Sequence, residues 1–183
     1  DGIEWDAVEL DEGQPIPPLD GYDALWVMGG PMDVWEEAEN PWLVPEQRAI
    51  REAVVDRGLP YMGICLGHQL LGASLGGKVG KAAQAEVGIL DVELTDAGRA
   101  DPMFSSMADS FKALQWHGAE VSVAPAGAAI LARSPLCGVQ ALRYGRHAYG
   151  MQFHTELTNQ TVGEWGKVPA YSCALDQTLG AGA

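Results

Sequence analysis

A cysteine between two glycines is the residue of this 183-residue chain with the clearest potential for covalent chemistry. Cys65 stands at the centre of a G-x-C-x-G pattern formed with Gly63 and Gly67, and apolar segments precede and follow it. This spacing is typical of a nucleophile elbow, the sharp strand-to-helix turn that exposes a nucleophile. Glycines let the strand and the helix approach closely, and a helix N-terminus favours thiolate over thiol. A tight turn around a buried structural cysteine is the alternative interpretation.

A histidine and a glutamate end a second apolar segment, which reads as a strand over residues 149–156. Side chains two positions apart in a strand point to the same side, so Glu156 can orient the imidazole of His154. A cysteine nucleophile needs such a base, and the base needs an orienting partner. Alone, His154 would be read as a structural histidine at a strand end. Together with the elbow it indicates a Cys-His-Glu site, in a chain order that differs from the Ser-Asp-His order of α/β-hydrolases.

With these motifs the sequence resembles the class I glutamine amidotransferases of the Cys-His-Glu triad type. It is most similar to the stand-alone members that resemble the glutaminase part of GMP synthase. The matching segments occur in the family's order and cover nearly the whole chain: residues 27–31, 63–69, 115–118 and 150–156. Thr155 stands where the family commonly has proline. The resemblance implies a flavodoxin-like α/β fold of three layers, with a mostly parallel central sheet and flanking helices.

The resemblance also implies roles for residues around Cys65. The backbone amides of Gly30 and Leu66 would form the oxyanion hole. The candidates for substrate binding are Gly29, Gln69, Trp116 and His117. His117 could serve as a second base, but the His154–Glu156 pair already supplies an oriented one. We therefore expect His117 to have a structural or substrate-positioning role.

The implied reaction is hydrolysis of the glutamine side-chain amide through a thioester on Cys65. It yields glutamate and ammonia, and the ammonia goes to an acceptor that the sequence does not identify. The resemblance implies that the ammonia goes to a synthetase domain or subunit. This chain has no G-x-x-x-x-G-K-[ST] phosphate loop, so the acceptor and a synthetase partner are expected to be either external or absent. One alternative is a γ-glutamyl peptide or amide hydrolase with the same triad, and another is a non-catalytic regulatory subunit. The implied mechanism needs no metal or organic cofactor, and the three cysteines lack the spacing of a zinc site.

Length and charge exclude several other classes of protein. The chain fits one domain, over residues 1–183, and is long enough for a sizeable core. Its net charge of −14 argues against nucleic acid binding, which needs clustered Lys and Arg. We find no signal peptide and no apolar run of about 18 residues, so no membrane association is expected. A reduced, cytoplasmic setting suits a working thiol.

The elements that would position these residues follow from hydrophobic periodicity and turn signals. Strands are expected at residues 3–10, 23–28, 61–64, 87–94, 129–132, 138–144 and 147–154, of which 23–28 should be buried. Helices are expected from Pro45 to Gly58, from the elbow to about residue 75, and over 158–166. The acidic, aromatic segment 32–42 is expected to be a loop near the mouth of the site, and residues 96–109 a loop or short helix.

The family's fold begins with a central strand and a helix ahead of the strand expected at residues 3–10. Nothing in this chain supplies them. A parallel strand needs a crossover of a dozen or more residues, so roughly 20–30 residues of the family's fold lie outside this sequence. We therefore expect an N-terminally truncated version of the family domain, whose sheet lacks its first strand.

Overall fold

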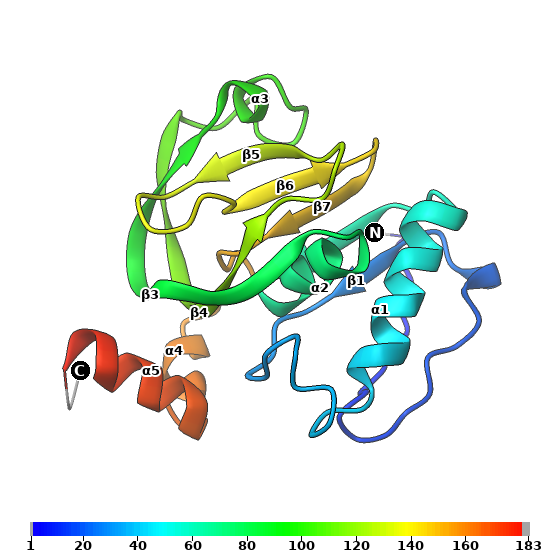
Figure 1. The fold of residues 1–183 in the computed structure, drawn as a ribbon, viewed down its shortest axis with the longest axis horizontal. Coiled ribbons are helices and arrows are strands. Elements are labelled where there is room, and N and C mark those ends of the chain that lie inside the picture. Colours follow the sequence, from blue (N-terminus) through cyan, green and yellow to red (C-terminus); the bar gives the residue numbers. More distant parts are fainter. Residues whose placement is uncertain (1, 181–183) are drawn as a thin grey trace.

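A seven-stranded sheet organises the chain in the computed structural model, which describes residues 2–180 (Figure 1). The strands are β1 (Leu25–Val27), β2 (Tyr61–Ile64), β3 (Lys78–Leu94), β4 (Ser110–Val123), β5 (Ala129–Arg133), β6 (Ala141–Tyr144) and β7 (Ala148–Met151). The helices are α1 (Leu43–Arg51), α2 (Leu66–Ser74), α3 (Asp96–Arg99), α4 (Thr161–Trp165) and α5 (Pro169–Leu179), with a 3-10 turn at Leu19–Gly21 and a π-helical turn at Glu52–Asp56. Within residues 2–180 no helix is long and apolar enough to cross a membrane.

The sheet is mixed, with the strand order β1-β2-β7-β6-β5-β3-β4. Only the pairs β1–β2 and β2–β7 are parallel, and the other four pairs are antiparallel. The predicted α/β class with flanking helices is confirmed, but the prediction of a mostly parallel sheet is wrong. The physical reason is connectivity, because β6 and β7 are joined by a tight turn at Gly145, and such turns link antiparallel strands.

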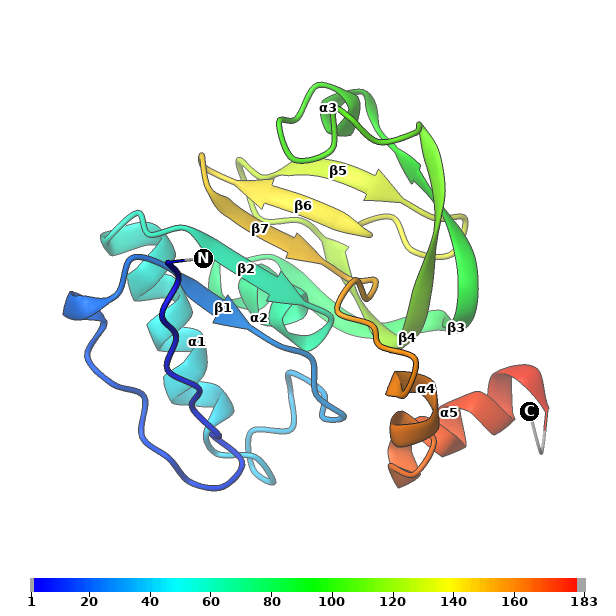
Figure 2. The same cartoon turned by 180° about the vertical axis from the view of Figure 1, so that it is seen from behind.

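Two groups of apolar side chains form the core on opposite faces of the sheet. Helices α1 and α2 lie over the β1–β2–β7 end of one face, where Leu43, Ile50 and Leu70 are fully buried (Figure 1). On the other face Ile64 and Phe104 belong to the second group, which the long curled strands β3 and β4 help to enclose (Figure 2). The parallel end of the sheet, with α2 against it, is the part that positions Cys65.

The prediction of a strand over residues 3–10 is wrong. This segment has no regular structure, and the side chains of Ile3 and Trp5 are 90% and 88% exposed. The sequence alternates, but a strand forms only where a neighbour completes its hydrogen-bond ladder and a core buries one of its faces. The next strand is also shorter and less buried than predicted. Of residues 23–28 only Leu25–Val27 form β1, and Trp26 is 65% exposed.

The helices begin and end within a few residues of the predicted positions. The first helix begins at Leu43, two residues before Pro45, and Gly58 adopts the predicted left-handed conformation after it, with a φ of 64°. The loop over residues 32–42 and the helix within 158–166 are confirmed. The last strand ends at Met151 and not at His154. Helix α5, which the sequence did not predict, lies with α4 beside β3 and β4 (Figure 2).

Candidate active site

Cys65 sits in a strained turn between β2 and α2. Its φ of 51° and ψ of −102° make it the one non-glycine residue with a positive φ among residues 2–180. Such a backbone costs about 1–3 kcal/mol and persists only where its surroundings impose it. Here the Cys65 amide donates to the carbonyl of Met151 at 2.8 Å, which ties the turn to the end of β7. The predicted elbow conformation is confirmed.

The two flanking glycines are needed because backbone fills the space where their side chains would lie. A Cβ atom on Gly63 would lie 2.5 Å from the carbonyl carbon and oxygen of Gly67. A Cβ atom on Gly67 would lie 2.3 Å from the carbonyl oxygen of Val27 on β1. Real Cβ atoms essentially never approach other atoms so closely. The G-x-C-x-G pattern therefore reports close packing of β1, β2 and α2 around the cysteine.

His154 and Glu156 form the pair that the sequence predicted. The Nδ1 atom of His154 lies 2.6 Å from Oε1 of Glu156, so Nδ1–H donates and the other ring nitrogen is left for Cys65. The second carboxylate oxygen of Glu156 accepts a 2.8 Å bond from the amide of Thr155. A proline has no amide hydrogen and could not make this bond. The substitution that separates this chain from the family's common pattern thus adds a restraint on Glu156.

The charge state of His154 depends on its neighbours. Burial lowers the pKa of His154, but Cys65 and Glu156 outweigh burial and raise it to about 9. Burial raises the pKa of Glu156, but the imidazole outweighs burial and the net shift is downward. The pair is therefore an imidazolium and a carboxylate at neutral pH. The edge of Trp165 also packs on the His154 ring, with centroids 4.5 Å apart.

Glu156→Gln should slow turnover while leaving the nucleophile in place. The amide can still contact Nδ1 but does not stabilise the imidazolium, so we expect the rate to fall by roughly two to four orders of magnitude. The measurement is product release at saturating substrate, beside Glu164→Gln, an exposed glutamate of α4. Equal rates for Glu156→Gln and the wild type would remove Glu156 from the mechanism.

A small cavity opens beside Cys65. Its volume is about 110 Å³. Six predicted site residues line it: Gly30, Cys65, Leu66, Gln69, Trp116 and His117. The loop residues Met32 and Asp33 also line it, as predicted for the 32–42 segment, and so do Ala170, Tyr171 and Ala174 of α5. Gly29, the remaining substrate-binding candidate, lies between the catalytic candidates, since a Cβ atom on it would be 3.4 Å from both Cys65 and His154.

The predicted oxyanion-hole residues are adjacent. Leu66 is the first residue of α2, where a backbone amide has no partner within the helix. Gly30 packs against it, because a Cβ atom on Gly30 would lie 3.1 Å from a methyl carbon of Leu66. Both residues line the cavity beside Cys65. This arrangement suits two amides that donate to one developing oxyanion.

Helix α5 contributes a side of the site that the sequence did not reveal. The indole nitrogen of Trp116 donates to the carbonyl of Tyr171 at 3.1 Å. The rings of Trp116, Trp165 and Tyr171 pack together, with centroid separations of 5.6–5.9 Å. Trp116 therefore anchors the C-terminal segment, and its polar atom is engaged by protein. No local pattern in the sequence predicts that α5 packs over the site, because this packing depends on aromatic contacts between residues far apart in the chain.

Two buried glutamines form a chain of contacts that leads to Cys65. The amide nitrogen of Gln69 donates to Ala119 O at 3.2 Å and to Gln152 Oε1 at 3.1 Å, and the nitrogen of Gln152 lies 3.6 Å from Cys65 Sγ. Both hydrogens of the Gln69 amide are thus engaged by protein. The sequence analysis did not single out Gln152. The signal was present, however, because Gln152 precedes His154 by two residues and shares its side of an extended segment.

His117 lines the cavity beside Cys65, and its imidazole also contacts a buried carboxylate. Its Nδ1 atom lies 2.9 Å from the carbonyl of Ala119, and its Nε2 atom lies 3.2 Å from Oε2 of Glu86, outside hydrogen-bond geometry. Glu86 is 2% exposed and also accepts bonds from Ser134 and Gln140, at 2.7 Å and 2.8 Å. Burial raises the pKa of Glu86, but His117, Ser134 and Gln140 together outweigh burial and lower it below the ordinary value of 4.5.

The Glu86 cluster should make stability depend on pH on the acid side. Because the folded-state pKa is lowered, ionised Glu86 stabilises the fold above pH 4.5, and this contribution is lost as the pH falls through the folded-state value. Glu86→Gln should therefore lower the free energy of unfolding by about 1.5–3 kcal/mol near neutral pH and by less in acid. Urea unfolding at several pH values measures this, with the exposed Glu93→Gln of the same strand as control. A difference that does not change with pH would contradict the assignment.

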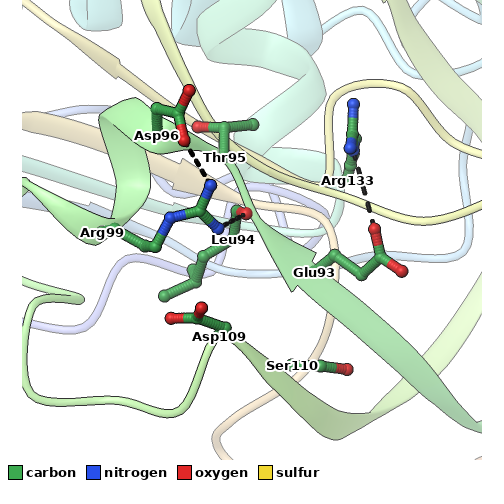
Figure 3. Close-up of a pocket in the computed structure, with 8 residues that line it drawn as sticks. All are labelled: Glu93, Leu94, Thr95, Asp96, Arg99, Asp109, Ser110 and Arg133. Carbon is green, nitrogen blue, oxygen red and sulfur yellow. Dashed lines mark hydrogen bonds and ion pairs between the residues drawn. The ribbon is translucent and has the colours of Figure 1, made fainter.

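A second cavity, of about 420 Å³, lies at α3 and the adjoining ends of β3, β4 and β5 (Figure 3). Its charges are largely paired, Arg99 with Asp96 and Arg133 with Glu93, the latter at 3.8 Å. Neither cysteine nor histidine lines it. Its greater volume does not make it the candidate site, because the reactive groups gather at Cys65. Over the described residues no group of three or more His, Cys, Asp or Glu side chains is placed to hold a metal ion.

Comparisons with known proteins point in the same direction. A model of the glutamine amidotransferase class-I family matches residues 2–165. One subunit of the glutamine-hydrolysing GMP synthase of Sulfolobus acidocaldarius is 33% identical over 163 residues, covering 88% of this chain and 81% of that protein. Gamma-glutamyl peptidase 5 of Arabidopsis thaliana is 30% identical over 169 residues, covering 90% of this chain and 66% of that protein. The crystal structure of a glutamine amidotransferase from Thermotoga maritima superposes with a TM-score of 0.82 and 30% identity, over 94% of this chain and 72% of that one.

Proposed function

The chain belongs to the glutamine amidotransferase class-I family, and we propose that it hydrolyses the side-chain amide of glutamine through a thioester on Cys65. The observation that carries the proposal is the placement of the strained Cys65 elbow beside a His154–Glu156 pair joined at 2.6 Å. A nucleophile, a base and an orienting acid then share one site at a cavity. We also propose that residues 1–183 act as one domain, which the single continuous sheet supports.

The proposed first step is attack by the Cys65 thiolate on the amide carbon of glutamine. The carbonyl oxygen becomes an oxyanion, and the amides of Gly30 and Leu66 donate to it. Each such donor is typically worth about 2.7–4 kcal/mol of transition-state stabilisation. The imidazolium of His154 gives its proton to the departing nitrogen as the C–N bond breaks. Ammonia leaves and a glutamyl thioester remains on Cys65.

The second step is hydrolysis of that thioester. His154, now neutral, accepts a proton from water, which attacks the thioester carbon within the same oxyanion hole. The C–S bond breaks, glutamate leaves, and Cys65 returns as a thiolate beside the re-formed imidazolium. Glu156 keeps the ring oriented through both steps by accepting the Nδ1 hydrogen. Both proton transfers at the reacting atoms pass through His154, and the carboxyl group of the product loses its proton to solvent.

The ammonia needs an acceptor, and we propose that a separate synthetase subunit provides it. The relative from Sulfolobus acidocaldarius is named as one subunit of GMP synthase, which supports a division of the two activities between separate chains. The proposed setting is cytoplasmic, because a catalytic thiol must stay reduced.

Hydrolysis of γ-glutamyl peptides is a second candidate function. It is supported by the 30% identity with gamma-glutamyl peptidase 5 of Arabidopsis thaliana, and it would use the same nucleophile and base. Glutamine remains the first choice, because the family whose model matches this chain is named for amide transfer from glutamine.

Release of glutamate and ammonia from purified protein tests the proposal. L-Glutamine and a γ-glutamyl dipeptide are supplied separately, and glutamate is measured in both reactions. Release from glutamine alone supports the first function, and release from the dipeptide alone supports the second. Absence of release from both substrates, from folded protein, would contradict an autonomous hydrolase and favour a non-catalytic regulatory subunit.

A further inference from the structure

The buried side chain of Gln152 contacts the sulfur of Cys65. Strand β7 lies beside β2 at the elbow (Figure 2). Gln152 directly follows β7, and its side chain is fully buried. Its Nε2 atom lies 3.6 Å from Cys65 Sγ, within the range of an N–H···S hydrogen bond. The Gln152 amide is thus a polar contact of the nucleophile in addition to His154. A bond from an N–H to an ionised acceptor is stronger than one between neutral groups.

The orientation of this amide is set by its other partner. Gln152 Oε1 accepts a 3.1 Å bond from the amide nitrogen of Gln69, so the Gln152 N–H group faces the sulfur. The second hydrogen of the Gln69 amide goes to Ala119 O at 3.2 Å, and the His117 ring bonds the same carbonyl. A flip of Gln152 would place two donors face to face and turn a carbonyl oxygen toward the sulfur. The network therefore permits one orientation.

We propose that Gln152 is a catalytic residue that donates an amide hydrogen to the Cys65 thiolate, and that Gln69 is the positioning residue that orients it. The inference deepens the proposed function and rests on it. The bond stabilises the thiolate before attack and again when the C–S bond of the thioester breaks and sulfur recovers its electron pair. Gln152 keeps its own protons throughout, so no further reactant is needed.

Two substitutions separate this role from simple packing. Gln152→Leu removes the donor and leaves an apolar side chain that is one atom shorter. Gln152→Glu keeps the shape and the acceptor for Gln69, but presents an oxygen to the sulfur. Gln115→Leu is the matched control. Gln115 is also fully buried, and its amide donates to Gln140 at 3.0 Å and not to the sulfur of Cys65. Unfolding midpoints establish that each variant is folded.

The probe is iodoacetamide, and the readout is the alkylation rate of the Cys65 peptide by mass spectrometry from about pH 5 to 9. Cys173, which is exposed, serves as the internal reference thiol. We expect the midpoint of the rate profile to rise by about one pH unit in Gln152→Leu and further in Gln152→Glu. Glutamate release should fall in the same order, while Gln115→Leu keeps the wild-type profile.

Wild-type profiles in both Gln152 variants would overturn the inference. A loss of the same size in Gln115→Leu would also overturn it, because any disturbance of the core would then suffice. Alkylation needs no substrate, so this readout decides the role of Gln152 even in a protein that releases no glutamate. Failure of the inference and failure of the proposed function are therefore distinguishable.

Discussion

Cys65→Ala should abolish the release of glutamate and ammonia from glutamine. The thioester requires a nucleophile at this position, and loss of a catalytic nucleophile typically lowers kcat by roughly four to six orders of magnitude. The fold should survive, because Cys65 is 5% exposed and alanine is smaller and also apolar. Folding is checked by the unfolding midpoint. The expected result is therefore a folded protein that does not turn over.

Cys173→Ala is the matched control for this substitution. Cys173 is also a free cysteine but is exposed on α5, and its sulfur contacts only a neighbouring glutamine among the described bonds. The variant should release glutamate at the wild-type rate. Cys137 is a poorer control because it is buried, and burial raises its pKa to about 12. Loss of activity in Cys173→Ala and not in Cys65→Ala would move the nucleophile away from the elbow.

Gly67→Ala should destabilise the protein strongly, although alanine is the better helix residue. Helix propensity alone favours alanine by about 1 kcal/mol. The new Cβ atom, however, would lie 2.3 Å from the carbonyl oxygen of Val27, and backbone cannot rotate aside as a side chain can. Overpacking of this kind costs about 1–3 kcal/mol and occasionally more. We expect a net loss near the top of that range, out of a total stability of about 5–15 kcal/mol.

Urea unfolding measures this loss, with Gly80→Ala as the control. Gly80 lies in β3, and a Cβ atom there would have no neighbour within 4 Å. Alanine at Gly80 should leave stability unchanged or raise it by about 0.5–1 kcal/mol. Equal stability of Gly67→Ala and the wild type would mean that β1 moves freely relative to α2. The close packing inferred for the elbow would then be wrong.

The local geometry of this site could be predicted from the sequence because it depends on local spacing. Gly63, Cys65 and Gly67 are alternate residues of one short segment, and the backbone geometry of a single turn explains all three. His154 and Glu156 are likewise two apart, so their side chains share a side in any extended segment. Patterns of this kind can be read without knowing what lies across the sheet.

Features that depend on distant neighbours were misread or missed. Residues 3–10 alternate like a strand, but no neighbour completes a ladder for them and Trp5 is 88% exposed. The mixed sheet follows from the order in which the strands pair, and local periodicity does not contain that order. The cover of the site by α5 depends on contacts of Trp116 with Tyr171, which lies 55 residues further along the chain.

By itself, the sequence identified the candidate nucleophile, the candidate base and the sharp turn at Cys65, because each depends on residues within one turn or one strand. The tertiary structure alone decided which polar groups surround the sulfur. Gln69 and Gln152 are 83 residues apart, and a single bond between them sets the orientation of the amide at Cys65. Hydrogen-bond direction over such separations arises only when the folded core brings the groups together and leaves each buried donor one acceptor.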